Sequence, residues 1–172
     1  SHGWQVHHFS TEQLDAKLPR LLYVSPSNPY KGRSLSPQQR LSLLHWAAEH
    51  HTYLLEDDYN GEFRYFSRPV SSLQGMSDGS SVIYLGSFSR LLLPSLRLSY
   101  MVLPPRLLER YRQLGHLYNQ TSSTIEQLAL ADFIAAGALC RHVKRLRKLY
   151  SSKNTLLRQA LTEIFGDRVV VR

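Results

Sequence analysis

The sequence predicts an α/β fold: a mostly parallel sheet with one antiparallel strand, followed by helices. Four short apolar runs predict strands over 20–25, 52–58, 81–87 and 96–104. A helix-like repeat separates the first two runs, and such a crossover is typical of parallel strands. Only about nine residues connect the last two runs, which is too short for a parallel crossover. We therefore expect the fourth strand to run antiparallel to the third.

The first helix is predicted to begin at Pro37, because Ser36 is a capping residue placed directly before a proline. Apolar residues then recur at helical spacing as far as His50 or His51. The segment 61–80 is rich in Gly, Pro and Ser and is predicted to form a loop.

Helices are predicted for most of the chain after the fourth strand. Ser123 and Glu126 have the spacing of a capping box, and Gly166 is typical of the residue that follows a helix. The apolar spacing predicts three helices, over 106–118, 122–137 and 139–165. Three consecutive valines at 169–171 predict the start of another strand.

The composition excludes several classes of protein. The 172 residues contain one cysteine, Cys140, which excludes an internal disulfide framework and a cysteine-based zinc site. The histidines show neither the His-x₃-His nor the HExxH pattern, so we expect no metal site. No apolar run approaches the roughly 18 residues of a membrane-spanning helix, and the first residues lack the pattern of a secretory signal. We expect a cytoplasmic protein.

The formal net charge of +8 is concentrated near the C-terminal end. Residues 141–172 carry nine Lys and Arg against two acidic residues, which gives +7. Four of the basic residues share one helix face by their spacing, namely Arg141, Lys144, Arg145 and Lys148. Such a run is usually a solvated helix face, and we favour that interpretation over contact with nucleic acid.

Polar segments follow the first three predicted strands at the point where each strand ends. They are SPSNPYKG (25–32), EDDYN (56–60) and GSFSR (86–90). The carboxyl ends of parallel strands share one edge of a sheet, and ligands of open α/β sheets bind there. We expect these segments to form one binding site, whereas Asp57 and Asp58 taken alone would indicate only a strand-end turn.

Two motifs in these segments resemble a known family. EDDY-x-x-EFRY begins at residue 56, and IYLGSFSR-x-L-x-P-S-L-R ends at Arg97. Their wording resembles that of MocR-type regulators, which are GntR-family transcription factors. The C-terminal domain of those regulators resembles a fold type I aminotransferase, an enzyme that depends on pyridoxal phosphate. The resemblance extends over nearly the whole chain and implies part of the large domain of an aminotransferase-like fold.

The resemblance implies positions for the pyridine ring of pyridoxal phosphate. Asp57 matches the carboxylate that hydrogen-bonds the ring nitrogen, and an ionised acid there keeps that nitrogen protonated and electron-withdrawing. Tyr59 matches the phenol that contacts the ring hydroxyl group. Asn28 lies near the asparagine that usually contacts the same hydroxyl group.

The resemblance also implies positions for the cofactor phosphate. Ser87 and Ser89 fall in the phosphate-binding turn of the family, and Arg97 matches the arginine that pairs with the phosphate. The planar guanidinium group of arginine presents parallel donors that suit a phosphate dianion.

One position departs from the family pattern. The last residue of the SFSK motif is the lysine that forms a Schiff base with the cofactor, and here it is Arg90. A Schiff base requires an amine that can become neutral, whereas a guanidinium group stays protonated. Covalent attachment is therefore not expected at Arg90. The cofactor then binds noncovalently, or does not bind, or the arginine was introduced to trap a state.

The resemblance also implies regions that the printed sequence does not contain. A winged-helix domain and a glycine-rich phosphate loop would precede it, and a small domain would follow it. On this basis we expect 1–138 to be part of the aminotransferase-like large domain and 139–165 to be a long linker helix. Residues 166–172 would begin a truncated small domain.

Three functions remain open at this point. The first is an effector- or pyridoxal phosphate-sensing domain of a GntR/MocR-type regulator, without turnover because of Arg90. It would bind a small amine or amino-acid effector, form a homodimer and reach DNA only through the winged-helix domain. The second is a fragment of a pyridoxal phosphate-dependent aminotransferase, which transfers amino groups between amino acids and 2-oxo acids. The third is a structural remnant that only dimerises.

Overall fold

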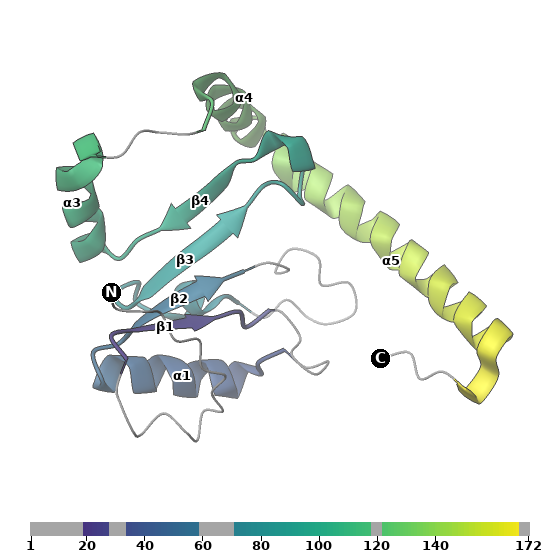
Figure 1. The fold of residues 1–172 in the computed structure, drawn as a ribbon. Coiled ribbons are helices and arrows are strands. Elements are labelled where there is room, and N and C mark those ends of the chain that lie inside the picture. The colour runs from purple at the N-terminus through teal and green to yellow at the C-terminus, as the bar shows by residue number, and fades with distance from the viewer. Residues whose placement is uncertain (1–18, 28–33, 59–70, 118–121, 169–172) are drawn as a thin grey trace, which may run out of the picture.

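The computed structural model describes residues 19–27, 34–58, 71–117 and 122–168. Within these residues four strands form one sheet, in the order β1-β2-β3-β4 (Figure 1). Helices follow the sheet in the second half of the chain, so the α/β class predicted from the sequence is confirmed.

The first three strands of the sheet are parallel. They are β1 (Leu21–Val24), β2 (Tyr53–Asp57) and β3 (Val82–Ser87). The fourth strand, β4 (Ser99–Val102), pairs antiparallel with β3. The short connection before β4 therefore set its direction as the sequence predicted.

Helix α1 (Pro37–Glu49) connects β1 and β2 and covers one face of the sheet (Figure 1). Its predicted start is confirmed, because the Ser36 hydroxyl accepts a hydrogen bond from the backbone N–H of Gln39 at 3.2 Å. The Gln39 side chain in turn accepts the backbone N–H of Ser36 at 2.9 Å, which completes a capping box.

The prediction of a continuous loop over 61–80 is wrong in its second half. A short helix, α2 (Leu73–Met76), lies there. The Ser72 hydroxyl accepts the backbone N–H of Gly75 at 3.0 Å, and the Glu56 carboxylate accepts two further N–H groups of the first turn. A carboxylate from a distant strand thus stabilises a helix that local composition does not indicate.

Three helices follow the sheet, as predicted. They are α3 (Pro105–Leu114), α4 (Thr124–Ala135) and α5 (Ala138–Phe165). The Ser123 hydroxyl caps α4 by accepting the backbone N–H of Glu126 at 3.5 Å. The predicted strand at 169–171 lies outside the described residues. No helix among the described residues is long and apolar enough to cross a membrane.

The buried core lies between the sheet and the helices α1 and α2. Its fully buried members are Leu43, Ala47, Leu54, Leu73 and Val82. Successive residues of a strand point to opposite faces, so Leu54 and Glu56 of β2 face this core. Asp57, the last residue of β2, therefore faces the opposite side of the sheet.

Candidate functional site

The carboxyl ends of β2 and β3 border a cavity of about 790 Å³. The three parallel strands point the same way, so their ends share one edge of the sheet (Figure 1). The cavity brings together the described residues that the motifs singled out, namely Asp57, Ser87, Ser89, Arg90 and Arg97. The other two predicted site residues, Asn28 and Tyr59, lie outside the described residues.

Asp57 is held at two points, by a residue of β1 and by the residue that directly follows this strand. The hydroxyl of Tyr23 donates a hydrogen bond to Oδ2 of Asp57 at 2.6 Å. The hydroxyl of Ser25 donates to the backbone oxygen of Asp57 at 2.9 Å. Tyr23 pairs directly with Leu55, which is two residues before Asp57, so Tyr23 lies on the same face of the sheet as Asp57. Ser25, two residues after Tyr23, lies on that face as well. The hydrogen bond to Asp57 and partial burial raise the pKa of Tyr23 to about 12, so its hydroxyl is a proton donor at neutral pH.

Asp58 also contributes a carboxylate to the cavity. The hydroxyl of Tyr84 on β3 donates to Oδ2 of Asp58 at 2.9 Å. Burial and this hydrogen bond raise the pKa of Tyr84 well above its ordinary value. Among the described residues, Oδ1 of Asp58 is buried without a hydrogen-bond partner. A buried polar oxygen without a partner at a cavity wall indicates room for an external donor.

The turn after β3 supplies the basic and hydroxyl groups of the cavity. Ser87 and Ser89 lie next to each other, since the backbone N–H of Ser89 donates to the Ser87 hydroxyl at 3.3 Å. Arg97 follows a 3₁₀ turn and adopts the left-handed conformation, with φ 49° and ψ 27°. A non-glycine residue in this region costs on the order of 1–3 kcal/mol, and such residues cluster at ligand sites.

The cavity wall beside these groups requires a glycine. Gly86 is buried, and a Cβ atom there would collide with the ring of Tyr100 on β4. Tyr100 packs against Phe88 with ring centroids 5.0 Å apart. Gly86 therefore permits Tyr100 to lie directly on the backbone of β3 and to form part of the cavity wall.

Helix α5 reaches the same cavity from outside the sheet. Tyr150 of α5 lines the cavity. His142 of α5 lies 2.9 Å from the backbone oxygen of Leu91, which requires Nε2 to donate. Its other nitrogen, Nδ1, lies 3.2 Å from a guanidinium nitrogen of Arg145 and accepts from it. The long helix therefore contacts the turn that contains Arg90.

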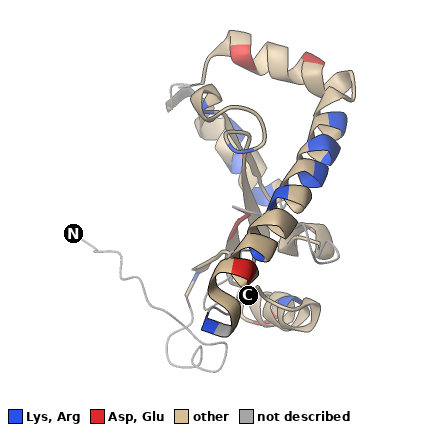
Figure 2. Ribbon diagram, turned by 90° about the vertical axis from the view of Figure 1, so that its right-hand side faces the viewer, with Lys and Arg blue, Asp and Glu red and all other residues tan. Residues whose placement is uncertain are grey.

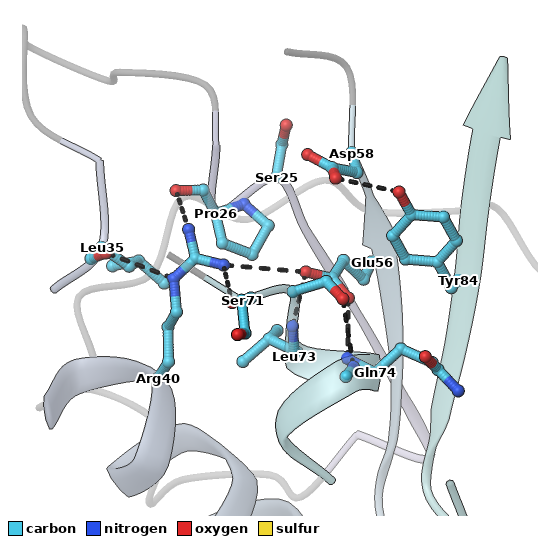
Figure 3. A network of polar contacts seen from close by, with 12 residues as sticks. Ser25, Pro26, Leu35, Arg40, Glu56, Asp58, Ser71, Leu73, Gln74 and Tyr84 are labelled. Carbon is cyan, nitrogen blue, oxygen red and sulfur yellow. Dashed lines mark hydrogen bonds and ion pairs between the residues drawn. The ribbon is translucent and has the colours of Figure 1, made fainter. Parts of the chain in front are cut away.

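A buried ion pair supports the site from the opposite face of the sheet (Figure 3). The guanidinium group of Arg40 on α1 lies 3.8 Å from the Glu56 carboxylate, and both side chains are 0% exposed. The same guanidinium donates to the backbone oxygens of Leu35 at 3.3 Å, Ser71 at 3.2 Å and Pro26 at 3.1 Å. Arg40 thus connects the segments on either side of the two loops that contain Asn28 and Tyr59.

Glu56 completes this network with the first turn of α2. Its carboxylate oxygens accept the backbone N–H of Leu73 at 2.8 Å and of Gln74 at 2.9 Å (Figure 3). Burial raises the pKa of the Glu56 carboxyl above its ordinary value, although these two N–H groups and Arg40 act in the opposite direction. The neighbours Glu56 and Asp57 thus serve opposite faces of the sheet.

The basic residues of the C-terminal segment gather along α5, as Figure 2 shows. The four that share one helix face, Arg141, Lys144, Arg145 and Lys148, are all exposed. The apolar side chains of α5 are also largely exposed, as at Leu156, which is 65% exposed. The charged face is therefore accessible, which both a solvated face and a nucleic-acid-binding face require, so the choice between them stays a prediction.

The residues around the cavity fit pyridoxal phosphate as a noncovalent ligand. A carboxylate at Asp57 suits a protonated pyridine nitrogen, and Arg97 with the Ser87 and Ser89 hydroxyls suits a phosphate. The cavity volume falls within the roughly 300–1,000 Å³ of small-molecule sites. Arg90 also lines the cavity, and its side chain ends in a guanidinium group and not in a primary amine. No cluster of three metal-binding side chains occurs within the described part of the chain.

Curated relatives share most of this chain. The HTH-type transcriptional regulator YdeL of Bacillus subtilis is 44% identical over 94% of the chain and 35% of its own length. The probable rhizopine catabolism regulatory protein MocR of Rhizobium meliloti is 36% identical over 88% of the chain and 30% of its own length. The chain therefore spans about a third of the relatives' length. No family model matches it.

A solved structure shares the fold. The α-aminoadipate aminotransferase LysN of Thermus thermophilus, complexed with N-(5'-phosphopyridoxyl)-L-leucine, superposes with a TM-score of 0.75 and 29% identity. The match covers 88% of this chain and 40% of that one. The fold and the site thus define an aminotransferase-like domain of fold type I. Within this class the chain is homologous to the MocR-type regulators of the GntR family, as its motifs indicated.

Several residues at the site were missed from the sequence. The period-two rule places Tyr23 and Ser25 on one face of their own segment, but their position beside Asp57 depends on the register between β1 and β2, which the sequence did not give. Tyr100 and Tyr150 carry no local signal, because their positions depend on the pairing of β4 and on the course of α5. Arg40 gave no signal either, since a charged residue within a helix usually lies on its solvated face.

We expect Arg40→Met to lower the free energy of unfolding by about 3–5 kcal/mol at neutral pH, because it leaves the Glu56 carboxylate buried without a cation. This decrease in the free energy of unfolding should be smaller near pH 5. Without Arg40 the pKa of Glu56 rises further, and the protonated form is tolerated in the folded state. Urea unfolding followed by circular dichroism measures both values. Arg106→Met, at an exposed position of α3, is the control, and an equal effect of both variants would contradict this role for Arg40.

The Tyr23–Asp57 hydrogen bond makes a stability contribution that depends on pH. The pKa of Tyr23 is raised from 10.0 to about 12, so the folded protein holds this proton more tightly than the unfolded chain. The contribution is therefore complete below pH 10 and is lost as the pH rises towards 12. The free energy of unfolding, measured with urea, should differ between the unaltered chain and Tyr23→Phe by an amount that narrows from about pH 10 to about pH 12. A difference that stays constant, or that narrows equally for Tyr111→Phe, would contradict this assignment.

Proposed function

We propose that this chain is part of the effector-sensing domain of a GntR/MocR-type transcription regulator and binds pyridoxal phosphate noncovalently. The observation that carries the proposal is the convergence of Asp57, Ser87, Ser89 and Arg97 on one cavity. These side chains match the two charged ends of the cofactor. The phosphopyridoxyl group named in the LysN complex supports this choice of ligand.

The residues of this chain would each do a separate part of the binding. Asp57 would accept the proton on the ring nitrogen, and Arg97 with the two serines would hold the phosphate. Bound pyridoxal phosphate would supply an electron-withdrawing ring and an aldehyde that reacts with amines. A small amine or an amino acid is therefore the class of effector that such a site would detect.

The regulatory part of the proposal concerns a longer protein. This chain spans about a third of the length of its relatives. We propose a homodimer whose DNA contacts come from a winged-helix domain outside this chain. Residues 1–138 would belong to the large domain, 139–165 would form the linker helix and 166–172 would begin the small domain. Ligand binding would shift the population of two dimer arrangements. The contacts of His142 and Tyr150 at the cavity edge would connect α5 to this shift.

A second candidate is a fragment of a pyridoxal phosphate-dependent aminotransferase, favoured by the fold shared with LysN. Amino-group transfer by that class of enzyme requires an amine at the lysine position. Arg90 lines the cavity there, and its guanidinium group stays protonated. We therefore favour the sensing function without turnover.

We expect the unaltered chain to bind pyridoxal phosphate and Arg97→Gln to bind it about 10- to 100-fold more weakly, as for the loss of a charged hydrogen-bond partner. Equilibrium dialysis with detection of the coenzyme measures the affinity. Arg110→Gln removes the same charge from an exposed position of α3 and should leave the affinity unchanged. Absence of binding to the unaltered chain, or equal weakening by both variants, would contradict the proposed site.

We expect borohydride to fix pyridoxal phosphate at position 90 only in the Arg90→Lys variant, because only that variant presents an amine at the cavity. A yellow absorbance band that survives dialysis should accompany the attachment. Peptide mapping by mass spectrometry identifies the modified residue, and exposed lysines such as Lys144 serve as internal controls. The same yellow band in the unaltered chain, surviving dialysis and fixed by borohydride on one of its lysines, would be evidence against noncovalent binding.

A further inference from the structure

We propose that Tyr23 is a positioning residue that sets the orientation of the Asp57 carboxylate for the ring nitrogen of the ligand. This inference rests on the proposed function, because it concerns how the proposed site holds pyridoxal phosphate. The hydroxyl of Tyr23 donates to Oδ2 of Asp57 at 2.6 Å. This distance lies in the range of roughly 2.5–2.7 Å typical of strong O–H···O⁻ hydrogen bonds.

The pairing of β1 with β2 creates this contact. Tyr23 pairs directly with Leu55, and Asp57 lies two residues further along β2 on the same face. A tyrosine is long enough to reach this diagonal neighbour. Ser25 fixes the backbone of Asp57 through a second hydrogen bond at 2.9 Å. The carboxylate of Asp57 is thus held by Tyr23 of β1, and its main chain is held by Ser25, which directly follows this strand.

Tyr23 acts through Asp57 and not on the ligand. Asp57 lines the cavity, whereas Tyr23 is not among the residues of its wall. The carboxylate of the last residue in a strand has several rotamers open to it. The hydroxyl of Tyr23 occupies Oδ2 and selects one of them. Since a hydrogen bond to a ring nitrogen depends on direction, the selected rotamer sets how well Asp57 meets the ring.

Two further observations concern the contact between Tyr23 and Asp57. The neighbouring carboxylate, Asp58, has its own tyrosine partner in Tyr84 of β3. Asp57 and Asp58 therefore accept hydrogen bonds from tyrosines of different strands. The raised pKa of Tyr23 agrees with this contact, since the hydrogen bond to Asp57 is its main cause.

The test measures the dissociation constants of two probes by equilibrium dialysis. One probe is pyridoxal phosphate, and the other is its deaza analogue, in which a CH group replaces the ring nitrogen. The variants are Tyr23→Phe, Asp57→Asn and their combination, with Tyr111→Phe on α3 as the matched control. Far-ultraviolet circular dichroism of each variant reports whether its folded structure is retained.

We expect Tyr23→Phe to raise the dissociation constant of pyridoxal phosphate about tenfold, as for the loss of one hydrogen bond to a charged group. The dissociation constant of the deaza analogue should change by less than about twofold. In the Asp57→Asn background the same substitution should have no further effect, because the two residues act as one unit. A tyrosine that merely supported the fold would weaken both probes equally and would do so in either background. That outcome would overturn the inference and leave the proposed function standing.

The remaining outcomes concern the proposed function. If the unaltered chain binds neither probe, the proposed function is wrong and this inference fails with it. If it binds both probes with equal affinity, Asp57 does not contact the ring nitrogen, and the positioning role of Tyr23 is overturned while phosphate binding by Arg97 is retained. Loss of folding in Tyr23→Phe alone would show a structural role and would also overturn the inference.

Discussion

The buried ion pair between Arg40 and Glu56 is the constraint on which the rest of the site depends. Two charged side chains withdrawn from water are tolerated only when their hydrogen-bonding groups have partners. Here the partners are backbone groups at Pro26, at Ser71 and in the first turn of α2. These positions lie beside the ends of β1 and β2. The electrostatic requirement of one pair therefore links Pro26, Ser71 and the first turn of α2 to the end of β2.

Successive side chains of a strand point to opposite faces, so this constraint also affects the other face of the sheet. With Glu56 directed towards Arg40, its neighbour Asp57 must face the opposite side, where the cavity lies. A shift of one residue in the register of β2 would bury Asp57 in the core and place Glu56 at the cavity. The cost of burying a carboxylate without Arg40 opposes that shift. The pair therefore favours the observed register of β2.

Local signals in the sequence predicted most of the fold, and contacts between distant segments account for what they missed. The cap at Ser36 and the short connection before β4 act over a few residues, and both predictions were confirmed. Helix α2 was missed because the Glu56 carboxylate that stabilises its first turn is 17 residues away from Leu73. Asp57 and Ser87 could be placed at one edge because parallel strands end together, whereas Arg97 was assigned to the site only by the family resemblance. Tyr150 could not be placed, since the course of α5 is set by tertiary packing.

Under the proposed function, Arg90 would separate two properties that aminotransferases combine in one site. Holding a cofactor requires charges and hydrogen-bond groups that match its ring and phosphate, and Asp57, Ser87 and Arg97 of the cavity would supply that set. Moving an amino group also requires an amine that loses its proton, which a guanidinium group does not supply. A sensor needs affinity and a differential effect on two states but no turnover. Under the proposed function, replacement of the lysine by arginine therefore removes chemistry that sensing does not need, and it leaves the binding groups in place.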